Sequence, residues 1–75
     1  MENTTKSIKL LVVEDHKVVR EALSALLNRQ QGIEVVGEAG SIEETKTIAE
    51  KVPPDITILD IVLPDGSGIE LARYL

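Results

Sequence analysis

Three short apolar runs alternate along the chain with segments whose apolar residues recur at helical spacing. The runs cover residues 9–15, 33–39 and 55–60. The first is apolar until two acidic residues end it, which is typical of a strand covered on both faces. The second contains a glycine and two glutamates, a weaker pattern that suits an edge strand. Because each run is followed by a helical segment, the sequence predicts the order βαβαβα.

The helical segments carry their own start and stop signals. Residues 16–29 have the i, i+3, i+4, i+7, i+8 spacing of one buried stripe, which we expect to contain Val19, Ala22, Leu23, Leu26 and Leu27. Gly32 stands where a helix end favours a left-handed residue. Ser41 with Glu44 forms a capping box for the second helix, and Ser67 starts a similar box for the third.

Connections of this length imply right-handed crossovers between parallel strands. The third strand could lie beyond the second or on the other side of the first. The weaker pattern of the second run favours the order 2-1-3, with the first strand central. This order places the first two helices on opposite faces and creates a switch point between strands one and three, where ligands of open α/β sheets bind. It also leaves the third strand as an open edge, uncovered on the side of the first helix.

Composition excludes several classes of function. The 75 residues suffice for one domain at most, and the absence of cysteine rules out disulfides and thiolate metal sites. A net charge of -5 offers no footprint for nucleic acid, so contact with DNA would have to be made elsewhere. No segment approaches the roughly 20 apolar residues of a membrane span. We expect a flexible N-terminus at residues 1–7 and a cytoplasmic protein.

Three carboxylates fall at the predicted carboxyl ends of the first and third strands: Glu14, Asp15 and Asp60. Gathered at one crevice they would repel one another, and a cation would relieve the repulsion. Mg²⁺ binds through one or two carboxylates with waters and phosphate oxygens, so it is the expected ligand. Asp60, alone on its strand, is the candidate nucleophile for an aspartyl-phosphate.

Each of these residues also has a simpler interpretation. Glu14 and Asp15 could merely cap the next helix, and Asp60 could be a solvated strand end. His16 is interpreted as an exposed surface residue rather than a phosphate relay or metal ligand. The DGSG segment lacks the lysine of a phosphate-binding loop, so turn chemistry explains it better.

Several spaced motifs resemble one family. VVED (12–15), ILD (58–60) and LPDGSG (63–68) are similar to the receiver domain of bacterial two-component response regulators. Residues 15–27 and 33–41 resemble the subfamily whose receivers precede a DNA-binding domain of the LuxR type, also called NarL/FixJ-type. The resemblance implies a flavodoxin-like doubly wound parallel sheet with strand order 2-1-3-4-5, of which this chain would form 2-1-3.

The resemblance also implies roles for individual residues. Asp60 would be the phospho-acceptor and Asp15 a direct Mg²⁺ ligand. Glu14 would act mainly through a metal-bound water, and the backbone carbonyl of Val62 would be a further ligand. The partner would be a sensor histidine kinase, and the parent protein a DNA-binding transcriptional regulator.

This sequence departs from the family pattern in several places. The family has two further strands, carrying a Ser or Thr that bonds the phosphoryl group and a Lys that pairs with it, which residues 1–75 do not include. Glu14 replaces a commoner Asp, and Ser67 replaces a frequent Asp. We therefore expect a truncated receiver without an effector domain, self-associating as a homodimer or swapped oligomer through the third strand. Whether these residues suffice for phosphorylation is left open.

Two alternatives to a receiver remain. The first is a Mg²⁺-dependent phosphohydrolase of the haloacid dehalogenase kind, which also forms an aspartyl-phosphate. Its D-x-D pattern is not met, since position 62 is Val and the general acid is absent. The second is a fragment that self-associates but is not phosphorylated.

Overall fold

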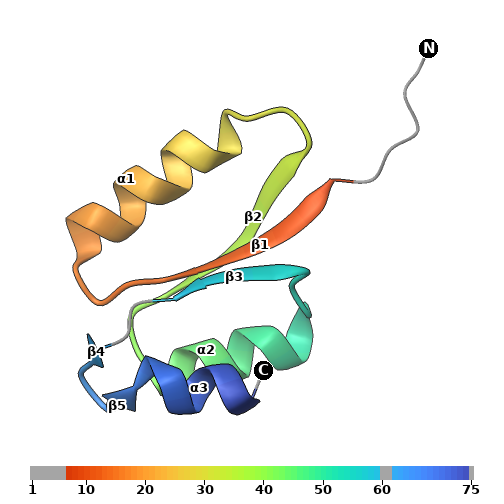
Figure 1. The fold of residues 1–75 in the computed structure, drawn as a ribbon. Coiled ribbons are helices and arrows are strands. Elements are labelled where there is room, and N and C mark those ends of the chain that lie inside the picture. Colours follow the sequence, from red (N-terminus) through yellow and green to blue (C-terminus); the bar gives the residue numbers. More distant parts are fainter. Residues whose placement is uncertain (1–6, 60–61, 75) are drawn as a thin grey trace.

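A computed structural model of the chain describes residues 7–59 and 62–74. Figure 1 shows the elements in chain order: β1 (Ile8–Val13), α1 (Lys17–Asn28), β2 (Ile33–Ala39), α2 (Ile42–Lys51), β3 (Ile56–Leu59), β4 (Val62–Leu63), β5 (Gly66–Ser67) and α3 (Gly68–Tyr74). The predicted alternation of strands and helices is confirmed, with a short hairpin of β4 and β5 added before α3. The first strand ends at Val13, so Glu14 and Asp15 belong to the following loop. Within the described residues, no helix reaches the length and hydropathy of a bilayer span.

The main sheet is parallel, in the order β2-β1-β3, as predicted. The central strand β1 is buried on both faces from Leu10 to Val13. This two-sided burial explains why its sequence is continuously apolar and not alternating. A register shift in the pairing of β1 with β2 falls between Leu10 and Leu11. The sheet therefore depends on β1, which pairs with both of its neighbours.

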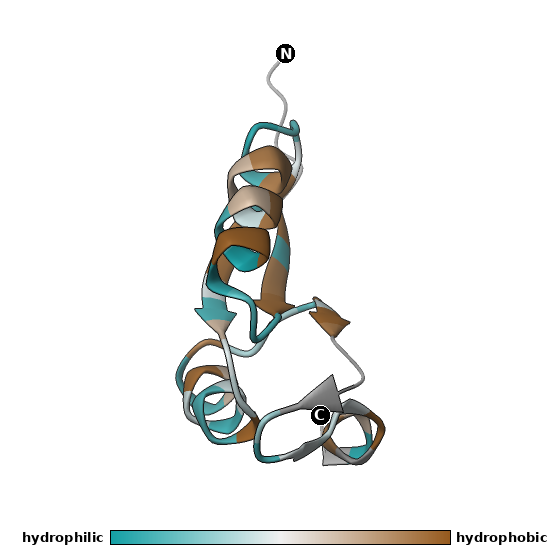
Figure 2. Cartoon of the chain, turned by 90° about the vertical axis from the view of Figure 1, so that its left-hand side faces the viewer, coloured by the Kyte–Doolittle hydropathy of each residue, from teal (hydrophilic) through white to brown (hydrophobic). Residues whose placement is uncertain are grey.

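The helices lie on both faces of the sheet, as the predicted topology requires. Figures 1 and 2 show α1 on one face and α2 with α3 on the other. The main core lies on the α2 and α3 face and consists of Leu11, Val13, Ala39 and Leu71, with Ile42, Ile48 and Leu59 packed against it. Each fully buried Leu or Val side chain contributes roughly 1.5–3 kcal/mol to folding. This face therefore carries a large part of the apolar burial, and Leu10 and Val12 are buried on the other face.

The predicted buried stripe of α1 is wrong in part. Val19 and Leu26 are 45% and 55% exposed, and Ala22 is exposed as well. The sheet-facing side of the helix instead carries Arg20, Leu23, Ser24 and Leu27. Arg20 and Asn28 both contact β2, so the flank with Val19 and Leu26 turns toward the β3 side of the sheet. No element of the described chain covers that flank.

The α1 face of β3 is also uncovered, as predicted. Ile56 and Ile58 pair with Leu10 and Val12 of β1, so they point to the same face of the sheet. They are 51% and 36% exposed, although Leu59 packs against the core on the other face. Because β3 pairs only with β1, its outer edge has no strand partner among the described residues.

The predicted helix signals are largely confirmed. Gly32 has φ +85°, the left-handed conformation expected of it. The Ser41 hydroxyl accepts a hydrogen bond from the Glu44 backbone N–H at 3.2 Å. The Glu44 carboxylate accepts from the Gly40 N–H at 2.7 Å, one residue before the position that a capping box uses. Both groups still satisfy backbone donors where α2 begins.

Asp65, in the turn of the β4–β5 hairpin, links this hairpin to the start of α2 by hydrogen bonds. Its two carboxylate oxygens accept hydrogen bonds from the backbone N–H groups of Ile42 at 2.8 Å and Glu43 at 3.2 Å. These bonds, led by the one from Ile42, hold the pKa of Asp65 below its usual value. A β-carbon on Gly66 would lie 2.6 Å from the Ile42 side chain, so the turn approaches α2 closely.

The substitution Asp65→Asn tests this link through pH. Because the pKa of Asp65 is lowered in the folded state, its charge stabilises the fold fully above its ordinary pKa of about 4, and this contribution is lost as the pH falls below that value through the lowered pKa of the folded state. We expect Asp65→Asn to have a lower Tm than wild type near pH 7, and the difference in Tm to shrink as the pH falls below the ordinary pKa of an aspartate. Thermal unfolding followed by circular dichroism measures it. Glu21→Gln, on the exposed side of α1, is the control. A lower Tm of Asp65→Asn that does not change with pH would contradict the role of the Asp65 charge in holding the hairpin to α2.

Candidate functional site

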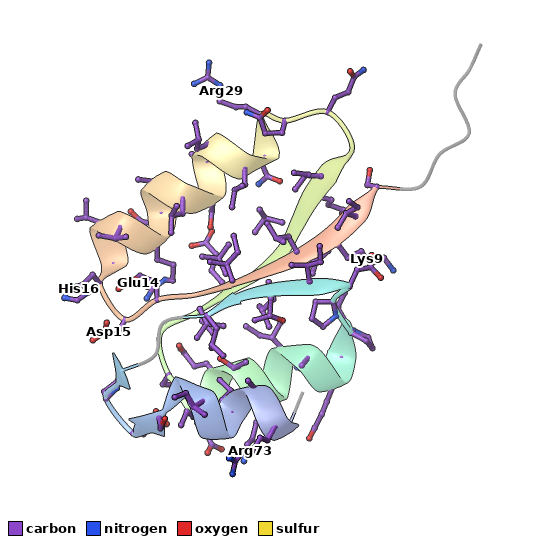
Figure 3. The ribbon with its side chains drawn as sticks, viewed as in Figure 1. Lys9, Glu14, Asp15, His16, Arg29 and Arg73 are labelled. Atoms are coloured by element: carbon purple, nitrogen blue, oxygen red, sulfur yellow. The ribbon has the colours of Figure 1, made fainter. Side chains whose placement is uncertain are left out.

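The loop after β1 carries the first two predicted site residues. Figure 3 shows Glu14 and Asp15 where β1 ends and α1 begins, with Lys9 at the opposite end of the strand. The Glu14 backbone N–H donates to the Ala39 carbonyl at 2.9 Å, which extends the contact with β2 beyond the last strand pair. The Glu14 side chain is 17% exposed and that of Asp15 is 33% exposed. Both carboxylates therefore remain within reach of solvent ions.

The pairing of β1 with β3 aligns the carboxyl ends of the two strands. Val13, the last residue of β1, pairs with Leu59, the last residue of β3. Asp60, the predicted phospho-acceptor, follows Leu59 in the sequence but lies outside the described residues. Its role stays a prediction, as do the roles of Glu14 and Asp15 as metal ligands.

Glu14, Asp15 and His16 form a tight cluster. One ligand atom from each lies within 4.8 Å of the others. The His16 Nδ1 atom is 2.7 Å from a carboxylate oxygen of Glu14 and 3.1 Å from one of Asp15. The His16 backbone N–H also donates to the same Glu14 oxygen at 3.1 Å. The structure thus brings together the two carboxylates that the sequence placed in one site.

His16 is exposed as expected, with 74% of its side chain accessible. Its contact with the two carboxylates was not expected, because the sequence analysis treated it as a surface residue outside the site. A signal was available: a residue that opens a helix directly after an acidic pair is close enough to hydrogen-bond back to it. A cation bound through the Glu14 oxygen would compete with the His16 ring for that atom.

Hydrogen bonds from the His16 ring, and then from its backbone N–H, hold the pKa of Glu14 below its usual value. Glu14 therefore stays ionised to a lower pH than an ordinary glutamate. An ionised glutamate next to an aspartate is a pair of hard oxygen donors. The local charge therefore favours a divalent cation.

Arg20 is a second residue that the sequence analysis did not place in the site. It leaves α1 one turn after the helix begins, and its Nη1 donates to the Glu14 carbonyl at 2.8 Å. Its Nε lies 3.9 Å from a carboxylate oxygen of Glu38 on β2. The guanidinium thus bridges the acidic loop and the end of β2.

The segment after β3 contains Val62, the remaining predicted site residue. Val62 begins β4 and pairs with Ser67 of β5, and Pro64 lies in the turn between these two strands. Gly68 begins α3. The predicted turn is confirmed, while the role of the Val62 carbonyl as a metal ligand stays a prediction.

The donor set of the described loop fits Mg²⁺. This ion takes oxygen ligands and binds proteins through one or two carboxylates, keeping several waters. Glu14 and Asp15 supply two carboxylates on one short, partly exposed loop. The described residues thus form an acidic cluster whose donor atoms suit a hard divalent cation.

Comparison with known proteins supplies the family. Residues 10–75 match the model of the response regulator receiver domain. The chain belongs to this family. Receiver domains of response regulators are signalling modules, and membership favours this class over the phosphohydrolase alternative. The flavodoxin-like fold expected of the chain is the fold of the family.

Two curated relatives of this receiver domain illustrate its relationships. The DNA-binding transcriptional activator DevR/DosR of Mycobacterium tuberculosis is 47% identical over 68 residues, covering 91% of this chain and 31% of the relative. The response regulator protein VraR of Staphylococcus epidermidis is 41% identical over 64 residues, covering 85% of this chain and 31% of the relative. The chain thus spans about a third of the length of these proteins.

Solved structures show the same fold. A two-component response regulator of the LuxR family from Aurantimonas superposes with a TM-score of 0.84 at 35% identity, over 92% of this chain and 49% of that one. The response regulator domain of CheB from Thermotoga maritima superposes with a TM-score of 0.84 at 32% identity, over 91% of this chain and 51% of the CheB chain. The three-stranded sheet and its helices therefore correspond to part of a receiver fold.

Proposed function

We propose that this receiver domain accepts a phosphoryl group on Asp60 and binds Mg²⁺ at Glu14, Asp15, Asp60 and the backbone carbonyl of Val62. The observation that carries the proposal is the position of the acidic loop. Glu14 and Asp15 follow the end of β1, and the pairing of Val13 with Leu59 aligns that end with the end of β3. Asp60 is the next residue in the sequence.

The chemistry assigned to Asp60 is nucleophilic attack on phosphorus. Its carboxylate oxygen forms the new bond to phosphorus, and the bond from phosphorus to the donor breaks, with its electron pair leaving on the donor. Mg²⁺, when bound, offsets the negative charge of the transferring group. The ionised carboxylate of Glu14, whose pKa is lowered by hydrogen bonds from His16, can hold the ion or a water bound to it. Asp15, the more exposed carboxylate, would bind the ion directly.

The donor proposed for this domain is a sensor histidine kinase, and the setting is the cytoplasm. The relatives include a DNA-binding transcriptional activator, which supports a role in transcription for the parent protein. The net charge of -5 supports placing any DNA contact outside these 75 residues. The domain would then act by changing the surface that it offers to other parts of the signalling system.

A Mg²⁺ titration followed by NMR tests the cation site. We expect weak, saturable shifts at residues 14, 15 and 60, because the proposed ligands converge there. Asp15→Asn should reduce the affinity by about tenfold or more, since it removes a charged ligand. Glu34→Gln is a matched control at the far end of the sheet, where Glu34 pairs with Lys9. Shifts spread over all the acidic residues, or none near residues 14, 15 and 60, would contradict the site.

A small-molecule phosphodonor tests the acceptor. The wild-type chain, Asp60→Asn and Asp55→Asn are treated with acetyl phosphate and Mg²⁺, and the acyl phosphate is measured by intact mass. We expect slow incorporation by the wild type and by Asp55→Asn, and none by Asp60→Asn, because Asp55 and Asp60 lie at opposite ends of the β3 segment. Labelling that survives Asp60→Asn would remove Asp60 from this role.

The open side of β3 supports a second part of the proposal, association with another copy of the chain as a homodimer or swapped oligomer. The outer edge of β3 has no strand partner in the described chain, and Ile56 and Ile58 are exposed beside it. Val19 and Leu26 of α1 extend the apolar surface on the same face of the sheet. Unpaired strand edges with apolar side chains associate readily with other strands.

Analytical ultracentrifugation tests the association. We expect the wild-type chain to sediment as a concentration-dependent oligomer, and Ile58→Lys to shift it toward the 8.2 kDa monomer, because a charge on an edge strand opposes pairing. Val18→Lys is the matched control, since Val18 is 78% exposed on the outward side of α1. A wild-type chain that remains monomeric at all concentrations would contradict association through the edge of β3.

A further inference from the structure

The Arg20 guanidinium lies in a confined position between α1, the acidic loop and the end of β2. Its side chain is 20% exposed, although arginine on a surface helix is mostly solvated. Its strongest described contact is the 2.8 Å hydrogen bond from Nη1 to the Glu14 carbonyl. The Glu38 carboxylate, 3.9 Å from Nε, is a looser contact. The guanidinium is therefore held mainly by the backbone of the acidic loop.

Gly40 provides the space that the guanidinium occupies. A β-carbon at position 40 would lie 2.7 Å from Arg20 Nη1, which is too close for any real contact. Any other residue at this position would push the guanidinium away from the loop or displace the backbone. The residue after β2 is thus matched to the Arg20 side chain.

Both backbone groups of Glu14 are consequently hydrogen-bonded to other elements. Its N–H donates to the Ala39 carbonyl of β2 at 2.9 Å, and its carbonyl accepts from Arg20 of α1 at 2.8 Å. These two bonds fix the peptide groups on either side of Glu14. Because Asp15 follows through the second of these peptides, its direction from the loop is fixed as well.

We infer that Arg20 is a positioning residue, which holds the Glu14 backbone so that the carboxylates of Glu14 and Asp15 keep the spacing required by a divalent cation. This inference rests on the proposed function, since it assigns Arg20 a role toward the same cation site. Residues that orient metal ligands without touching the metal change metal affinity by about 10–100-fold when they are replaced. Arg20 would act in this way through its hydrogen bond to the Glu14 carbonyl, in the loop that carries the two carboxylates.

An electrostatic role for Arg20 would have the opposite sign. A positive charge near the carboxylates repels a cation, so removing it would tighten Mg²⁺ binding if charge were its only contribution. A positioning role requires that the same substitution weaken binding. The direction of the change therefore separates the two roles.

Three variants test the inference by Mg²⁺ titration with NMR detection. Arg20→Lys keeps the charge but loses the planar donor group, and Arg20→Gln removes the charge as well. Gly40→Ala leaves the charges of Arg20 and Glu38 intact, and its added β-carbon displaces the Arg20 guanidinium. We expect all three to weaken Mg²⁺ binding by about tenfold. Glu34→Gln, which removes an acidic charge at the far end of the sheet where Glu34 pairs with Lys9, is the control expected to bind as wild type.

Amide hydrogen exchange without metal provides a second readout. We expect the Glu14 N–H to exchange faster in Arg20→Gln and Gly40→Ala than in wild type, because the loop is less firmly held. Urea unfolding of each variant measures global stability. Faster exchange at Glu14 with unchanged exchange in the β1 core supports local positioning, whereas a uniform increase along β1 shows a general loss of stability and overturns it.

The outcomes for Arg20 and for the cation site are distinguishable. Wild-type protein that shows no Mg²⁺ response contradicts the proposed function, while the exchange rates still decide whether Arg20 holds the loop. Wild-type protein that binds Mg²⁺, with Arg20→Gln and Gly40→Ala binding as tightly or more tightly, overturns the positioning role and leaves the cation site intact.

Discussion

Parallel pairing of β1 with both of its neighbours is the constraint on which the rest of the structure depends. It buries Leu10 to Val13 on two faces, and it aligns the end of β1 with the ends of β2 and β3. The buried strand ends where the polar loop begins, so the carboxylates appear at the edge of the core and not within it. A charged site thus arises beside the most apolar strand, because the same pairing determines both.

The topology could be predicted because each step had a local signal. Continuous apolar runs indicated buried strands, and the weaker pattern of residues 33–39 indicated an edge, which led to the order 2-1-3. The burial of α1 was predicted less well, since periodicity identifies an apolar face but not which part of it is covered. Val19 and Leu26 fit the helical pattern as well as Leu23 and Leu27 do. Only the lateral position of the helix over the sheet distinguishes them.

The candidate site was predicted from residue types, whereas its supporting contacts were not. Glu14 and Asp15 were identifiable because the predicted strand order places the carboxyl ends of the first and third strands, with their acidic residues, at the switch point of the sheet. Arg20 had no such signal, since an arginine in a surface helix is ordinary and its side chain reaches back to the Glu14 carbonyl only in the folded arrangement of loop and helix. Asp65 was hidden for a similar reason, because it contacts α2 across 23 residues of sequence. The contact of Ser41 with the Glu44 backbone could be predicted because it follows a local pattern, whereas side-chain contacts to the backbone of another element have no such pattern in a single sequence.

The fastening of Asp65 to α2 has a mechanical consequence. The hairpin follows the predicted acceptor in the chain, and it cannot move away from α2 without giving up two hydrogen bonds to the backbone where that helix begins. A β-carbon on Gly66 would lie 2.6 Å from the Ile42 side chain at the same place, so the hairpin and the start of α2 are close together. A displacement that starts just beyond β3 would be transmitted directly to a helix on the opposite side of the sheet from α1.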